Sequence, residues 1–290
     1  MIMATFARAS VAHKQDGSQV ASGVPRYEAG QNGQAIMVEE GTVNLLPLDL
    51  GQWTQEVGAT RSLLGETYLG QPVYRGCSAA GGSFISPFSL PAAGVVVGDW
   101  LTLSFYARAY NGNAAGSAHI SGGDSIAWGI PNDGQWHRVA ISRQATTISG
   151  ICEIRTAAGP NKDLDFCAGQ VEKKPYATSF VNGTRAVETL QMPLTALSPQ
   201  EFTVEFVLLV SAMTKRQVSG LYPTWFTLAA DDAAHGGGRS EITLVQSENS
   251  ADLYLLGYRN GASMGLGIPS AQISNGWRRL ALRSEERRGG

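Results

Sequence analysis

The chain has 290 residues, which is long enough for two domains or for one large domain with a sizeable core. Hydrophobic residues make up 43% of it, charged residues only 16%, and there are 35 glycines. This composition favours an all-β protein with many tight turns over a helical enzyme. The formal net charge is −2 and the body of the chain has no basic cluster, which argues against nucleic-acid binding.

The N-terminal residues contain no long apolar run, so neither a signal peptide nor a membrane span is expected. Residues 1–45 are polar, glycine-rich and irregular, apart from a short strand-like piece at Ala35–Glu40. This segment has too few apolar residues to fold alone. We expect an arm that packs on its own domain or on a neighbouring subunit.

Residues 46–183 show short alternating segments separated by turn residues, without a helical stretch between them. This pattern favours a β-sandwich. The clearest strand is Asp99–Tyr110, and a second one lies in Gly134–Ser142, where Trp136 is interpreted as a core anchor. The residues of the first strand that should share one face are Leu101, Leu103, Phe105 and Ala107.

Residues 184–290 restart the alternating pattern after a polar stretch, Glu172–Arg185, which is interpreted as a linker or domain edge. Tyr258–Gly261 contains an Asn-Gly pair and predicts a β-hairpin. Gly276–Ser284 closely repeats the pattern of Gly134–Ser142, and its Trp277 is likewise interpreted as a core anchor. The predicted fold is therefore all-β, with two antiparallel jelly-roll-type β-sandwiches in tandem (46–183 and 184–290) after the arm (1–45).

No catalytic constellation is found in the sequence. The glutamates lack the same-face spacing of a sandwich glycosidase, and the four histidines are scattered. The three cysteines, Cys77, Cys152 and Cys167, have no metal-ligand spacing and are expected to be buried thiols, with a Cys152–Cys167 bridge as the alternative. The chain is therefore not expected to be an enzyme, and no cofactor is expected apart from structural calcium.

Aromatic side chains flanked by polar groups can stack on the flat faces of sugars. The candidate glycan-binding residues are Tyr74, Tyr106, Tyr110 and Trp128. The alternative is that these rings are simply half-buried parts of the core. Four acidic residues near turns are candidate calcium ligands, with solvated carboxylates as the alternative. They are Asp163, Asp165, Asp231 and Asp232.

Four stretches then occur in a familiar order: FARAS (Phe6–Ser10), DGSQV (Asp16–Val20), VPRYE (Val24–Glu28) and VEEGTVNLL (Val38–Leu46). Together they resemble the opening module of tail-fibre, spike and minor structural proteins of tailed bacteriophages. In that family the module precedes a carbohydrate-binding-module-like jelly roll, which closes with a segment similar to QVEKKPYATSF (Gln170–Phe180). The following domain, from about Phe202, resembles a concanavalin A-like (laminin-G-like) sandwich.

The resemblance implies a virion component, assembled in the host cytoplasm, that displays glycan-binding-like sandwiches toward a host surface polysaccharide. It also implies other virion proteins as partners and a homo-oligomer, expected to be a trimer, with neither a nucleic-acid nor a membrane partner. The alternatives are a binding module of a bacterial carbohydrate-active enzyme and a purely architectural spacer.

The C-terminal part is short for a concanavalin A-like sandwich, so the second domain is expected to be incomplete. The final residues RSEERRGG, from Arg283, can be encoded by a string that matches the start of a common sequencing adapter. The hypothesis is that they are an artefact and that the natural chain continues, with a solvated charged tail as the alternative.

Overall fold

The computed structural model describes the N-terminal two thirds of the chain with gaps, and only the strands of the remainder. The described residues are 5–14, 16–30, 33–39, 41–46, 49–55, 60–77, 82–85, 93–120, 125–148, 152–157, 163–191, 202–210, 224–232, 238–246, 253–259, 262–268 and 276–284. The chain divides into a first unit, Met1–Pro193, and a second unit, Leu194–Gly290. Among the described residues there is no helix long and apolar enough to span a membrane.

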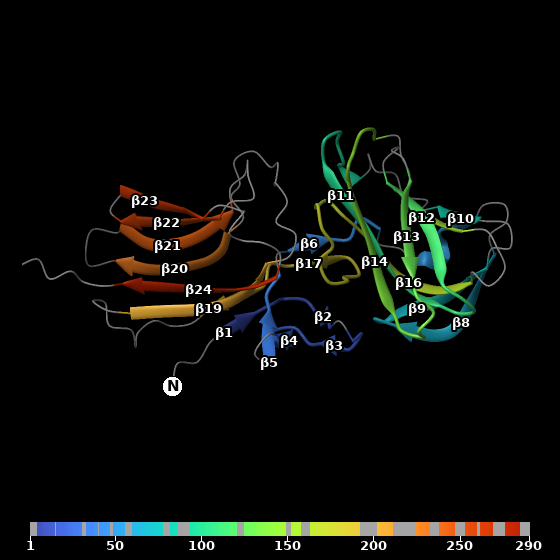
Figure 1. Cartoon of the computed structure of the whole chain (residues 1–290), viewed down its shortest axis with the longest axis horizontal. Helices are drawn as coiled ribbons and strands as arrows, with labels where there is room; N and C mark the ends of the chain where they lie inside the picture. Colours follow the sequence, from blue (N-terminus) through green and yellow to red (C-terminus); the bar gives the residue numbers. More distant parts are fainter. Residues whose placement is uncertain are drawn as a thin grey trace, which may run out of the picture. The chain divides into compact units, whose positions relative to one another are not determined.

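The first unit contains two five-stranded antiparallel sheets that pack face to face as a sandwich (Figure 1). One sheet has the order β13-β12-β15-β10-β7, with strands Ile126–Ile130, Ala114–Ile120, Cys152–Thr156, Gly82–Ile85 and Thr54–Gln55. The other has the order β14-β11-β16-β9-β8, with strands His137–Gln144, Trp100–Ala109, Leu164–Glu172, Gln71–Cys77 and Thr60–Tyr68. A short 3-10 helix, η1 (Leu50–Gln52), precedes β7.

Apolar residues at every second position of β11 form part of the core between the two sheets. Its four predicted core residues, from Leu101 to Ala107, are all 0% exposed and belong to the cluster between the sheets. On β14, Val139 and Ile141 are buried in the same cluster whereas Ala140 is exposed. The predicted facing of these two strands is therefore confirmed, and so is the sandwich.

A second, smaller core lies on the outer face of the β11–β16 sheet. It contains Leu69, Val73, Tyr106, Cys167, Ala168 and Phe180. The pairing of β8 with β9 is interrupted between Leu63 and Thr67, and the turn between them places Leu69 at φ 54° beside a glycine. The end of this hairpin places Leu69 in the outer cluster and packs Tyr68 against it.

The structure corrects the interpretation of Trp136 as a core anchor. The residue is only partly buried, and it packs against the outer cluster rather than between the sheets. Its ring stacks on that of Tyr68 with centroids 4.6 Å apart. Trp136 lies on the face of its strand that the alternation predicts. That face is covered by the end of the β8–β9 hairpin, so the ring packs there and not between the sheets.

The N-terminal arm packs on its own sandwich. It comprises β1 (Thr5–Ala7), β2 (Ala12–His13), β3 (Gln19–Val20), β4 (Arg26–Gly30), β5 (Gly33–Met37) and β6 (Thr42–Val43). β1 pairs with β18 (Thr189–Gln191) and β6 with β17 (Thr184–Arg185), whereas β2–β3 and β4–β5 form separate hairpins. The arm is thus tied by short ladders to the end of the first unit.

A buried ionic network joins the arm to this end. Glu188 accepts hydrogen bonds from Arg8 Nη1 at 3.3 Å and from Arg26 Nη2 at 3.0 Å, and all three side chains are 0% exposed. Glu39 pairs with Arg26 at 2.5 Å and with Arg185 at 3.0 Å. Burying charges is costly unless they are paired and hydrogen-bonded, and here each carboxylate has two arginine partners.

Glu172–Arg185, predicted to be a linker or domain edge, lies near the end of the first unit and is packed rather than solvated. Glu172 is 0% exposed, and its carboxylate accepts hydrogen bonds from the hydroxyls of Thr42 at 2.6 Å and Thr178 at 2.5 Å. The Lys174 ammonium donates to the Gly41 carbonyl at 2.7 Å. The sequence alone suggests a solvated segment because two of these partners, Thr42 and Gly41, lie more than a hundred residues away in the arm.

The described part of the second unit is also composed of antiparallel strands. β20 (Thr224–Asp232), β21 (Gly238–Gln246), β22 (Leu253–Arg259) and β23 (Ala262–Ile268) form one sheet in that order, and β19 (Phe202–Val210) pairs with β24 (Gly276–Ser284). Arg259 pairs with Ala262, so the predicted hairpin is confirmed. The side chain of Trp277 lies outside the described residues.

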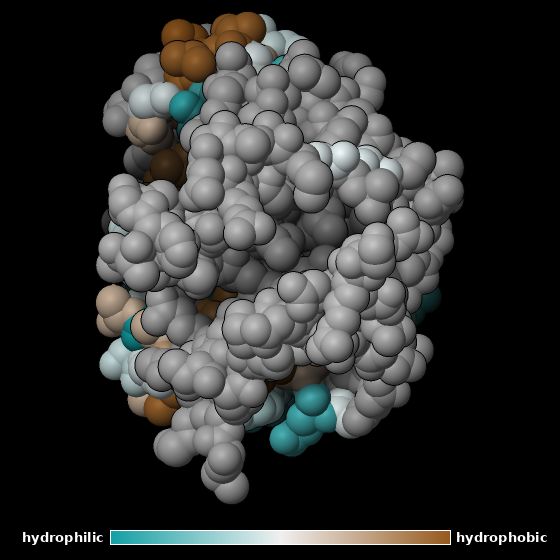
Figure 2. Space-filling model, turned by 90° about the vertical axis from the view of Figure 1, so that its left-hand side faces the viewer, coloured by the Kyte–Doolittle hydropathy of each residue, from teal (hydrophilic) through white to brown (hydrophobic). Residues whose placement is uncertain are grey.

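Several large apolar residues of the first unit are exposed to solvent, among them Tyr27, Val38 and Val187. In the view of Figure 2, described residues coloured brown (hydrophobic) lie at the margin beside others coloured teal (hydrophilic). Single exposed apolar residues are normal on protein surfaces and need no functional explanation.

Candidate functional site

Three neighbouring strands place charged side chains side by side on the outer face of the β11–β16 sheet. Arg108 on β11 is directly opposite Asp165 on β16, and Asp165 is opposite Arg75 on β9. Directly opposite residues of antiparallel strands point to the same face, so the carboxylate lies between the two guanidinium groups.

Asp165 is the fixed centre of this arrangement. It is 1% exposed and accepts hydrogen bonds from Arg75 Nε at 2.7 Å and from Arg108 Nη2 at 2.7 Å. Arg108 Nη2 also donates to Glu66 Oε1 at 2.5 Å. Burial alone would lower the pKa of Arg108, but the hydrogen bonds and charges of Asp165 and Glu66 outweigh it and raise the pKa. Arg108 therefore stays charged, and hydrogen bonds to Asp165 hold both arginines in place.

Tyr110 extends this surface beyond the end of β11. The guanidinium of Arg75 lies 3.4 Å from the centroid of the Tyr110 ring, and the residue is 53% exposed. Such a cation–π contact can hold an exposed aromatic ring in one orientation even where no apolar side chains pack over it. We refer to Glu66, Arg75, Arg108, Tyr110 and Asp165 as the Tyr110 ledge.

The four predicted glycan-binding residues do not come together. Tyr106 is 7% exposed and lies in the outer cluster, with Tyr68 at 5.4 Å and the Arg138 guanidinium at 5.5 Å from its ring centroid. Trp128 is 8% exposed and meets Phe105 edge to face between the sheets.

Tyr74 lies on the opposite face of β9 from Arg75. It packs against the main core and its hydroxyl is 3.5 Å from a carboxylate oxygen of Asp49. Burial and the nearby Asp49 raise its pKa. Of the four predicted residues, Tyr110 therefore has the most exposed position.

The candidate calcium ligands have other partners where they are described. Asp165 is held by two arginines, whose positive charges would repel a cation. Asp163 accepts a hydrogen bond from the Asn111 amide at 2.9 Å. Within the described residues, no three His, Cys, Asp or Glu side chains gather in a group that could hold a metal ion. The side chains of Asp231 and Asp232, at the end of β20, lie outside the described residues.

The described cysteines and His13 are poorly suited to catalysis. Cys152 and Cys167 are free and buried, as predicted, and burial raises the pKa of Cys152 to about 12. Cys167 also has a raised pKa through burial, so neither thiol is a nucleophile near neutral pH. Burial lowers the pKa of His13, whose Nδ1 is 3.4 Å from the Phe180 carbonyl oxygen. The side chain of Cys77 lies outside the described residues.

From the sequence, Arg75, Arg108 and Glu66 are not identified as site residues, and Asp165 is a candidate only as a calcium ligand. The alternation of β11 does assign Tyr106 and Arg108 to one face, which is a usable signal. The partners Arg75 and Asp165 could not be inferred, because they depend on which strands become neighbours and in which register.

No family model matches the chain, and no curated protein matches it. Among solved structures, the chain is similar to the N-terminal CBM22-1–CBM22-2 tandem domain of Paenibacillus barcinonensis Xyn10C, with 12% identity over 86% of each chain and a TM-score of 0.34. A likeness at this level carries no information about a ligand. The chain is thus an all-β protein of two units, the first a β-sandwich with a buried ionic arm attachment and an exposed tyrosine–arginine ledge.

Proposed function

We propose that the first unit is a non-catalytic module that binds an uncharged polysaccharide at the Tyr110 ledge. The observation that carries the proposal is the half-exposed Tyr110 ring, backed at 3.4 Å by a guanidinium that Asp165 holds in place. A pre-oriented aromatic ring next to fixed hydrogen-bonding groups suits a pyranose, because the ring covers the C–H face while the polar groups meet the hydroxyls.

The charges of the ledge favour a neutral sugar. Two arginines, Arg75 and Arg108, stand beside the carboxylates of Asp165 and Glu66, with Asp163 adjacent to Tyr110 through a backbone hydrogen bond. The surface therefore has no surplus of positive charge to attract an acidic polysaccharide.

The binding test compares two exposed tyrosines of the same unit on a glycan array, followed by titration with the polysaccharide that binds. We expect Tyr110→Ala to weaken binding about tenfold, the scale of one lost stacking contact. Tyr27→Ala is the matched control, because Tyr27 is 43% exposed on β4 and outside the ledge. Equal losses in both variants, or binding to no polysaccharide, would contradict the proposal.

The biological setting that we propose is the tail fibre or spike of a bacteriophage virion, where the chain would act as a structural and adhesion protein. The support is that three of the stretches that resemble phage tail proteins supply Arg8, Arg26 and Glu39 to one buried network. They therefore form one structural unit rather than a chance series of motifs.

Electron microscopy tests this setting, with an antibody against the first unit applied to virions of a phage that encodes the chain. Labelling of tail fibres or spikes is expected. Absence of the protein from purified virions, together with retained polysaccharide binding, would instead favour a binding module of a bacterial carbohydrate-active enzyme.

A further inference from the structure

A cleft opens at one side of the sandwich, where each sheet ends in an edge strand. β13 and β14 are the terminal strands of the two sheets, and within the described part of the chain each has a single paired neighbour. The cleft between them has a volume of about 450 Å³ and is lined by residues 126–131 and 137–142. Unpaired strand edges are templates for another strand unless charges, proline or a covering element protect them.

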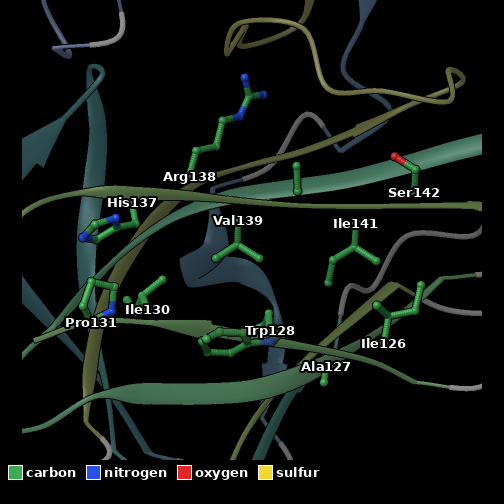
Figure 3. A pocket seen from close by; sticks show the side chains of 12 residues that line it. Ile126, Ala127, Trp128, Ile130, Pro131, His137, Arg138, Val139, Ile141 and Ser142 are labelled. Atoms are coloured by element: carbon green, nitrogen blue, oxygen red, sulfur yellow. The ribbon is translucent and has the colours of Figure 1, made fainter. Parts of the chain in front are cut away.

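Apolar side chains from both strands face each other in the cleft, although its lining also includes His137, Arg138 and Ser142. Figure 3 shows Val139 and Ile141 pointing from β14 toward Trp128 on β13, whereas the side chain of Arg138 points away from the cleft. The sequence of β13, Ile-Ala-Trp-Gly-Ile, contains neither a charged residue nor proline, whereas β14 carries Arg138 and Arg143.

Two residues that line the cleft each have a buried side-chain donor without a partner among the described residues. The indole Nε1 of Trp128 is buried, in a residue that is 8% exposed, and has no partner among the described residues. The Nε of Arg138 is also buried without a partner, although its Nη2 donates to Ser104 Oγ at 2.9 Å. Buried donors without acceptors are uncommon in proteins and call for an explanation.

Arg138 supplies the charge that selects an occupant. The ion pairs of the described residues do not include Arg138, so its positive charge is balanced by no carboxylate there. A strand added to the edge of β14 would alternate, with one set of side chains in the cleft and the other on the outer face beside Arg138. The complementary strand therefore has large apolar residues alternating with acidic ones.

We propose that the edge of β14 and the adjoining cleft bind an extended segment of a partner protein in which apolar and acidic residues alternate. The backbone of the segment pairs with β14, an apolar side chain enters the cleft beside Trp128, and a carboxylate meets Arg138. This is β-strand addition, in which backbone hydrogen bonds give affinity and side-chain pockets give specificity. A second copy of the chain fits less well, because it would add another Arg138 cation rather than the anion that this residue lacks.

The test uses the full chain and two synthetic peptides, acetyl-Thr-Glu-Leu-Glu-Leu-Glu-Thr-amide and its counterpart with lysine at each glutamate position. Binding is measured by calorimetric titration, and the site by backbone amide shifts in NMR spectra. We expect the acidic peptide to bind at least tenfold tighter than the basic one and to shift amides of β14. Methylation of every leucine, glutamate and threonine backbone nitrogen of the acidic peptide should abolish binding, because the peptide can then no longer donate to the strand edge in either orientation.

Variants assign the charge selection to Arg138. Arg138→Gln should remove the preference for the acidic peptide, and Arg138→Glu should reverse it in favour of the basic peptide. Arg155→Gln, which removes a cation from β15 in the other sheet, should leave the preference unchanged. Equal binding of the two peptides, an equal effect of both glutamine variants, or dimerisation of the free chain through β14 in place of peptide binding would overturn the proposal.

Discussion

Glu188 is the residue on which the attachment of the N-terminal arm most depends. Its carboxylate accepts from Arg8, from Arg26 and from the backbone N–H of Glu39 at 2.8 Å, and it is 0% exposed. The arm itself contributes few buried apolar residues. Its position is therefore held by charge-assisted hydrogen bonds, which are stronger than neutral ones and fix direction.

Replacing Glu188 by glutamine should destabilise the first unit by about 3 kcal/mol, because the buried Arg8 would lose its carboxylate partner and Arg26 would keep only Glu39. The measurement is urea unfolding of the full chain, and the probe is hydrogen exchange of backbone amides in peptides that contain β16. Glu66→Gln is the control, since Glu66 is a partly exposed carboxylate that pairs with Arg108, and it should cost less than about 1 kcal/mol. Similar losses in both variants would show that the network contributes little to stability.

At the scale of the element, the pairing of β12 with β13 requires a glycine at position 116. A Cβ at Gly116 would lie 1.9 Å from the Arg155 carbonyl oxygen and 2.6 Å from an atom of the Trp128 ring. Gly116 is opposite Trp128 in the ladder between these strands, so the glycine makes room for the indole. Neither the backbone of β15 nor a ring packed in the core can move away cheaply.

Gly116→Ala should therefore destabilise the first unit by about 1–3 kcal/mol, the usual cost of overpacking, or more if the strand must shift. The matched control is Gly129→Ala on the neighbouring strand, where the nearest atom would lie at 3.8 Å. That variant should be neutral or slightly stabilising, because alanine restricts the unfolded chain. The midpoint of thermal unfolding of the first unit compares the two, and an equal midpoint for both would contradict this account.

Some features of these strands could be predicted from the sequence, and others could not. The burial of β11 and β14 follows from an alternation with period two, so their strands and core residues could be predicted locally. The position of Trp136 could not, because the apolar layer over it comes from the turn at Leu69, far away in the chain. For the candidate site, the exposed Tyr110 could be predicted, whereas its support by Arg75 and Asp165 depends on sheet order and register.

At the scale of the whole molecule, the buried groups of the arm attachment make the first unit sensitive to acid in two steps. Burial lowers the pKa of His13 from its ordinary 6.5, so the unfolded chain takes up this proton first and stability falls as the pH drops below about 6.5. Burial raises the pKa of Glu39, but Arg185, Arg26 and hydrogen bonds from Ser179 outweigh it and leave the pKa below the ordinary 4.5. Glu39 therefore stabilises the fold above pH 4.5, and this contribution is lost as the pH falls through its lowered pKa.

Unfolding free energies measured between pH 7.5 and 3 should accordingly show an upper decline below about pH 6.5 and a second decline below about pH 4.5. Glu39→Gln should be less stable than the parent chain at pH 7 and yet lose less stability in the lower window, because its side chain has no proton to take up. His13→Gln should lack the upper decline and keep the lower one. If Glu39→Gln loses as much stability as the parent chain below pH 4.5, then other carboxylates cause the acid sensitivity and the arm attachment does not control it.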